Sequence, residues 1–215
     1  MSTVIDMREA VVLLERFPAL AGATATIDSG EIVLLQGPNG VGKTTFLRSC
    51  AGLLPVASGR LDVLGHDLVG ARRAVRRHVA LLGHTSQLYD DLTVVDNVKF
   101  WSKANGVRDG DLAGALDRMG VSKRLYSIPV ERLSAGQKRR VAIAIVIASR
   151  PRLWLLDEPH AGLDQAGRDL LDSLLGDATE AGATVVFASH ELDRAEAVAS
   201  RSLVFSGGVI VSDDA

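Results

Sequence analysis

The feature that most constrains the fold of this chain is a glycine-rich stretch at residues 37–44, which fits the pattern of a glycine, four residues and then Gly-Lys-Thr. An apolar run at residues 32–35 precedes it, and residues 45–50 continue as a predicted helix. A loop between a buried strand and a helix directs backbone N–H groups and the positive end of the helix dipole at an anion. We therefore predict a polyphosphate site made of Gly37, Pro38, Asn39, Gly40, Val41, Gly42, Lys43, Thr44 and Thr45.

The last two side chains of this stretch provide a positive charge and a hydroxyl group at the predicted site. We expect Lys43 to reach the outer phosphates of the bound polyphosphate and Thr44 to hold a Mg²⁺ ion that bridges them. A chance glycine turn is the alternative, and the flanking strand and helix argue against it. The stretch alone leaves kinases, GTPases, helicases and transporter ATPases open.

A second predicted site follows the apolar strand at residues 153–156, which ends in Asp157 and Glu158. Ligands of an open α/β sheet bind at the carboxyl ends of its strands. Asp157 can hold the metal and Glu158 can act as general base on an attacking water. A solvated acidic turn is the alternative for such a pair taken alone.

Residues 133–137, Leu-Ser-Ala-Gly-Gln, lie between these two sites and narrow the class. Ser134 can cap the following helix, with Gln137 as its capping-box partner, so the helix start offers N–H groups to an anion. The segment resembles the signature of ATP-binding-cassette (ABC) ATPases. In that family two cassettes face head to tail, and the signature of one covers the nucleotide of the other. The resemblance gives this role to Ser134, Ala135, Gly136 and Gln137.

The same resemblance implies roles for four further residues. Gln87 matches a glutamine that contacts Mg²⁺ and the attacking water, and Asp164 matches a loop at the dimer interface. His190 matches a histidine that contacts the terminal phosphate, and Phe17 lies where an aromatic ring stacks on adenine. Core packing stays an equal alternative for Phe17. Taken singly, Gln87 could be a polar loop residue, Asp164 a helix cap and His190 a turn residue.

Two positions depart from the usual family pattern. Ala135 replaces a commoner glycine, which preserves anion binding unless that residue needs a positive φ. His160 and Ala161 stand where a hydroxyl residue is commoner before Asp164, and the sequence gives His160 no role.

Composition favours one compact domain over residues 1–215 with a cytosolic location. Lys and Arg total 24 against 26 Asp and Glu, so no global basic field draws nucleic acid, and basic runs such as residues 138–140 read as solvated helix faces. The single cysteine, Cys50, excludes an internal disulfide. The longest apolar run, residues 141–148, is far below the roughly 20 residues of a spanning helix, so we expect membrane contact only through a partner.

The predicted fold is α/β: a P-loop NTPase with a mostly parallel sheet, antiparallel strands on the N-terminal side and an inserted helical subdomain. Short strands are expected at residues 11–14, 23–27 and 60–64. The helical subdomain is expected at about residues 88–150, with a helix over residues 138–149. The glycine pair at residues 207–208 predicts a closing hairpin.

The predicted function is that of an ATP-hydrolysing ABC transporter subunit on the inner face of the cell membrane, which pairs with a second, identical cassette and drives transmembrane permease subunits. Residues 133–142 and 153–159 also resemble the ATPase of haem exporters that serve cytochrome c maturation. Another small exporter, an iron-sulfur assembly cassette and a regulatory cassette remain alternatives. DNA-repair cassettes need more residues, and a simple kinase has no use for Ser134 and His190.

Overall fold

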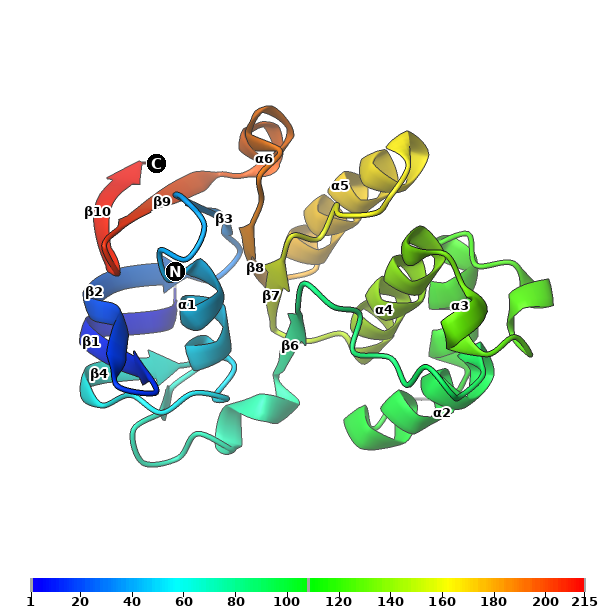
Figure 1. Ribbon diagram of the computed structural model, residues 1–215, viewed down its shortest axis with the longest axis horizontal. Helices are drawn as coiled ribbons and strands as arrows, with labels where there is room; N and C mark the ends of the chain where they lie inside the picture. Colours follow the sequence, from blue (N-terminus) through cyan, green and yellow to red (C-terminus); the bar gives the residue numbers. More distant parts are fainter. Residues whose placement is uncertain (1, 108, 215) are drawn as a thin grey trace.

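The computed structural model describes residues 2–107 and 109–214 and confirms the predicted α/β class (Figure 1). Among the described residues, the main sheet has six strands in the order β10-β9-β3-β8-β7-β6. Five of them run parallel, and β10 pairs antiparallel with β9 through the predicted glycine hairpin. These strands are β3 (Ile32–Gln36), β6 (Val79–Leu82), β7 (Leu153–Asp157), β8 (Thr184–Ala188), β9 (Arg201–Ser206) and β10 (Val209–Asp214).

A second, antiparallel sheet lies on the N-terminal side, in the order β2-β1-β4-β5. The predicted strands at residues 11–14 and 23–27 prove to be parts of two 12-residue strands. The sequence analysis underestimated them because polar residues alternate with apolar ones where one face of a sheet meets solvent. The bounds are β1 (Thr3–Leu14), β2 (Phe17–Asp28), β4 (Ser58–Val63) and β5 (His66–Asp67).

Helices cover the main sheet and form a separate lobe, drawn in green in Figure 1. The lobe contains α2, α3 and the start of α4. Helix α4 begins at Ala135 instead of residue 138, because Ser134 caps it directly. The α-helices are α1 (Lys43–Cys50), α2 (Val94–Asn105), α3 (Asp109–Arg118), α4 (Ala135–Ser149), α5 (Gln165–Glu180) and α6 (Leu192–Val198), and the 3-10 turns are η1 (Ala74–Arg77), η2 (Lys123–Leu125) and η3 (Val130–Arg132).

Two hydrophobic cores meet at the main sheet. In β7, Leu153 and Leu155 face the core shared with α1 and the antiparallel sheet, whereas Trp154 and Leu156 face the core shared with the other helices. Strands buried on both faces read as continuous apolar runs, which explains why these were found in the sequence. Strands β3, β7 and β8 end together at Gln36, Asp157 and Ala188, and this edge carries the polar residues described next.

Candidate functional site

The phosphate loop connects β3 to α1, and its glycines are required by close backbone contacts. Gly37 has φ +133°, and a Cβ there would lie 2.6 Å from the carbonyl oxygen of Phe205. Gly42 caps α1 with φ +119°, and a Cβ there would lie 2.7 Å from the carbonyl oxygen of Ala19. Larger residues would have to displace backbone, so the loop can hold this shape only with glycine at both positions.

Lys43 and Thr44 start α1 and point their polar atoms in different directions. Lys43 Nζ donates to the carbonyl oxygens of Gly37 at 2.5 Å and Pro38 at 3.0 Å, inside the curve of the loop. Burial lowers the pKa of Lys43, and the nearby carboxylates of Glu158 and Asp157 oppose that shift. The Thr44 hydroxyl donates to Oδ2 of Asp157 at 2.8 Å. A hydroxyl and a carboxylate thus meet beside the loop, and both offer the oxygen ligands that Mg²⁺ prefers.

Glu158 leaves the end of β7 in a strained backbone conformation. Its φ is +50°, which costs a non-glycine residue about 1–3 kcal/mol and persists only where neighbours impose it. Its N–H donates to the carbonyl oxygen of Ala188 at 2.9 Å. Its carboxylate accepts a hydrogen bond from the backbone N–H of His190 at 3.1 Å and lies 3.3 Å from Nε2 of that residue. The strain therefore sets a carboxylate against a half-exposed imidazole.

These residues line one cleft of about 510 Å³, which is within the usual size range of small-molecule sites. The cleft brings together two of the sequence-predicted groups, the phosphate loop and the acidic pair, with His190. Its predicted lining residues are Asn39, Gly40, Gly42, Lys43, Thr44, Thr45, Asp157, Glu158 and His190.

Five lining residues were missed by the sequence analysis: Leu14, Ala19, Arg48, Leu54 and His84. His84 follows the carboxyl end of β6, so the rule that ligands bind at strand ends could have pointed to it. The others come from the antiparallel sheet and from the far side of α1. No local pattern in the sequence marks them as neighbours of the phosphate loop.

Phe17 and Gln87 lie outside the cleft lining, as do Gly37, Pro38 and Val41 of the phosphate loop. Phe17 starts β2 and is 77% exposed, so its side chain is free of the core. Gln87 has φ +54° and lines a different hollow, between the main sheet and the helical lobe, together with Leu88 and Trp101. Their proposed contacts with nucleotide stay predictions.

The segment at residues 133–137 also lies outside this cleft. The predicted capping box is confirmed: Gln137 N–H donates to the Ser134 hydroxyl at 3.2 Å, and Ser134 N–H donates to Oε1 of Gln137 at 2.9 Å. Ala135 is the first residue of α4 and has no positive φ, so its methyl group is tolerated. A Cβ on Gly136 would lie 2.6 Å from the carbonyl oxygen of Gly162, which packs this helix start against the loop before Asp164.

Asp164 caps α5 and joins it to α4. Its Oδ1 accepts hydrogen bonds from Gly167 N–H at 3.0 Å and from Arg140 Nη2 at 2.6 Å. These bonds lower the pKa of Asp164, with the backbone bond to Gly167 as the largest cause. Asp164 is therefore held as a carboxylate between the two helices.

Arg139 corrects the expectation that residues 138–140 form a solvated face. Its side chain is buried, at 4% exposure, and within the described residues its guanidinium donates to backbone carbonyls. The acceptors are Gly83 at 2.7 Å, Asp157 at 2.9 Å, Pro159 at 3.2 Å and Glu158. Burial lowers the pKa of Arg139 to about 10, against the effect of Asp157 and Glu158. This arginine ties α4 to the turn that carries Glu158.

Comparison with known proteins gives one consistent family. A family model described as ABC transporter matches residues 20–161. The cytochrome c biogenesis ATP-binding export protein CcmA of Mesorhizobium japonicum is 40% identical over 172 residues, which cover 79% of this chain and 83% of that protein. The phospholipid-transporting ATPase ABCA7 of Homo sapiens is 35% identical over 196 residues, which cover 89% of this chain and 9% of that longer protein.

A solved structure described as the ATP binding subunit of an ABC transporter has the same fold. Its TM-score is 0.90 at 25% identity, and the alignment covers 98% of this chain and 89% of that one. The match spans the cleft, the segment at residues 133–137 and the helical lobe.

Replacement of Arg139 tests its role in the site. In Arg139→Met the four carbonyls lose a donor, and each buried unsatisfied group costs about 1–3 kcal/mol. We expect the free energy of unfolding to fall by about 2–4 kcal/mol in chemical denaturation.

The neighbouring Lys138→Met is the matched control. It removes only an exposed pair with Asp90 and should change the unfolding free energy by about 1 kcal/mol or less. Equal denaturation midpoints for the two variants would contradict the role given to Arg139.

Proposed function

This chain belongs to the ABC transporter family and is an ATPase of that family, and we propose that it closes on a second copy of itself around ATP to drive a transmembrane partner. The observation that carries the proposal is the division of the site. The cleft holds the phosphate loop and the acidic pair, whereas the capped start of α4 lies outside it. A second chain can supply what each cleft lacks.

ATP binding depends on the phosphate loop. We infer that the backbone N–H groups of the loop and of the α1 start surround the phosphates, with Lys43 as a point charge on the outer ones. Thr44 and Asp157, already 2.8 Å apart, would hold Mg²⁺ together with Gln87. When bound, Mg²⁺ would neutralise negative charge that spreads over the phosphate oxygens. Phe17 would stack its exposed ring on adenine.

Hydrolysis depends on the pair at the end of β7 and β8. We infer that Glu158 accepts a proton from the attacking water, while His190 donates a hydrogen bond to the terminal phosphate. Their present contact of 3.3 Å keeps both groups at the same end of the cleft.

Closure brings the second half of the site. The α4 start, with Ser134, Ala135, Gly136 and Gln137, would bind the terminal phosphate of the partner's nucleotide, and Asp164 would lie at the interface. Closure is a population shift that ATP drives, because these contacts exist only in the closed dimer.

Glu158→Gln tests the hydrolysis step. The amide cannot take a proton, so we expect turnover to fall by about 10²-fold or more while ATP binding persists and closed dimers accumulate. Steady-state ATPase assays and size-exclusion chromatography with ATP measure both effects. Glu180→Gln, at the exposed end of α5, is the control and should match wild type. Undiminished turnover in Glu158→Gln would refute the general-base assignment.

A mixing experiment tests the composite site. Lys43→Met and Ser134→Arg should each abolish hydrolysis alone. In a head-to-tail dimer of one copy of each, one site is intact, so an equal mixture should recover about a quarter of wild-type activity.

The control mixes Lys43→Met with Glu158→Gln. Both residues serve the cleft of their own chain, so every site in the mixed dimer keeps a defect and no activity should return. Failure of the first mixture to recover any activity would contradict the composite site.

The cargo proposal rests on the curated relatives. In the described part of the chain, no helix is both long and apolar enough to cross a membrane. We propose that the chain sits on the inner face of the cell membrane through permease subunits and drives haem export for cytochrome c maturation. The relative named for cytochrome c biogenesis is matched over most of its length, whereas the phospholipid-transporting one is matched over 9%.

Co-purification tests the partner and the cargo together. A tagged chain is isolated from its native membrane, and its partner is identified by mass spectrometry. We expect an integral membrane protein that stimulates ATPase activity, with further stimulation by haem. Stimulation by phospholipid and not by haem would contradict the haem proposal, and a partner outside the membrane would contradict transport.

A further inference from the structure

The turn that carries Glu158 leads into a histidine that faces inward. His160 is 1% exposed, and its ring packs edge-to-face on Phe187 of β8 with the ring centroids 6.5 Å apart. Its Nε2 lies 2.8 Å from Oδ1 of Asp172 on α5. A buried imidazole therefore connects the end of β7 to the helix that covers it.

The contact with Asp172 defines how the ring is used. A carboxylate only accepts hydrogen bonds, so Nε2 of His160 carries the proton and donates it. Nδ1 is buried and has no hydrogen-bond partner in residues 2–107 and 109–214. The ring thus makes one hydrogen bond in this pocket, and Asp172 receives it.

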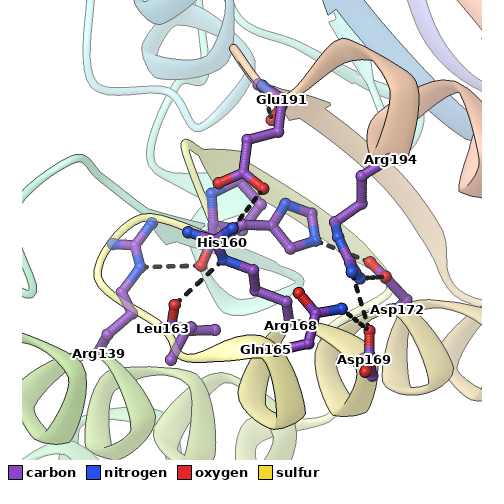
Figure 2. A network of polar contacts seen from close by, with 11 residues as sticks. Arg139, His160, Leu163, Gln165, Arg168, Asp169, Asp172, Glu191 and Arg194 are labelled. Carbon is purple, nitrogen blue, oxygen red and sulfur yellow. Dashed lines mark hydrogen bonds and ion pairs between the residues drawn. The ribbon is translucent and has the colours of Figure 1, made fainter.

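Asp172 extends the connection to α6. Its Oδ2 accepts a hydrogen bond from Arg194, whose other terminal nitrogen lies 2.9 Å from Oδ1 of Asp169. Figure 2 shows the contacts of His160 and Arg194 meeting at the carboxylate of Asp172. We call the path from His160 through Asp172 to Arg194 the α5 strap.

A second contact runs beside the strap. Arg168 Nε donates to the carbonyl oxygen of Leu163 at 3.1 Å, and its Nη1 lies 3.0 Å from Oε2 of Glu191 (Figure 2). Glu191 directly follows His190. Helix α5 therefore holds both the loop after Glu158 and the loop that carries His190.

The α5 strap connects the loops that carry Glu158 and His190, the two groups that hydrolysis needs in a fixed relative position. Glu158 lies two residues before His160, and His190 lies four residues before Arg194. The side chain of His190 is 53% exposed, so its position depends mainly on the backbone of its loop and of α6. That backbone is anchored to the Glu158 turn through Asp172.

We propose that His160 is a positioning residue for ATP hydrolysis, which keeps Glu158 and His190 in mutual register through the α5 strap. The inference rests on the proposed function, because it uses the roles given there to Glu158 and His190. His160 is buried behind the turn and acts only through these two loops. We expect ATP binding to depend mainly on the phosphate loop between β3 and α1, and the contact from His190 to matter mainly in the hydrolysis step.

If His160 only filled space, substitutions at this position would give a different result. Packing against Phe187 requires an apolar surface, which leucine supplies. Positioning requires a donor to Asp172, which leucine lacks and glutamine retains through its side-chain amide. The two variants therefore separate the two roles.

The test compares the full chain as wild type, His160→Leu and His160→Gln in single-turnover ATP hydrolysis, with ATP affinity and thermal unfolding measured in parallel. We expect the rate constant of hydrolysis in His160→Leu to fall by about tenfold or more, while the Kd for ATP changes by about twofold or less. His160→Gln should return to within about threefold of the wild-type rate.

Arg194→Met interrupts the far end of the strap, where the side chain is 21% exposed and the variant is expected to fold. We expect the same fall in rate. The double variant His160→Leu/Arg194→Met should be no slower than the slower single variant, because both break one path. The control Arg118→Met removes an exposed pair that joins α3 to Asp177 of the same helix α5, and it should stay within about twofold of wild type.

Wild-type rates in His160→Leu and Arg194→Met would overturn the proposal, and so would a loss confined to ATP affinity. If His160→Leu fails to fold, Arg194→Met decides the outcome alone. Persistent turnover in Glu158→Gln would instead remove the assignment of Glu158, which distinguishes failure of the proposed function from failure of the strap.

Discussion

The site depends on the hydrogen bonds that the buried guanidinium of Arg139 donates to backbone carbonyls. These carbonyls lie at the end of β7 and just beyond the ends of β6 and β7, where regular strand pairing stops. A planar group with several donors suits such a cluster, which a lysine could not span. By binding these carbonyls, Arg139 stabilises the turn in which Glu158 adopts a positive φ.

Because Arg139 belongs to α4, the same interaction couples two parts of the site. Ser134 starts that helix, and Gly136 touches the carbonyl of Gly162 in the loop before Asp164. Arg140 holds Asp164 from the next position. A motion of the helical lobe that moves α4 would therefore reach Glu158, the proposed general base, through backbone contacts. This coupling offers a physical route between the proposed membrane partner and the proposed chemistry at Glu158.

Much of the fold and of the site was predictable because its causes are local. The phosphate loop, the capping box at Ser134 and the hairpin at Gly207 and Gly208 each depend on residues a few positions apart. The continuous apolar runs of the central strands reflect burial on both faces. Strand lengths in the antiparallel sheet were underestimated, since alternating polar residues hide a strand that has one face in solvent.

Other features had no local sign. Arg139 looked like part of a solvated basic run, and its burial depends on carbonyls 18–20 and 56 residues away along the chain. His160 had no role predicted from the sequence, because its partner Asp172, which Arg194 also contacts, lies on another element. His84 and Arg48 joined the cleft only when separate elements met. By itself, the sequence determined the α/β class, the family and the chemistry offered at each motif, because these follow from residue type and short spacing. Only the tertiary structure decided which charges are buried, which carbonyls they satisfy and how Glu158 and His190 are held together, because those depend on packing between distant segments.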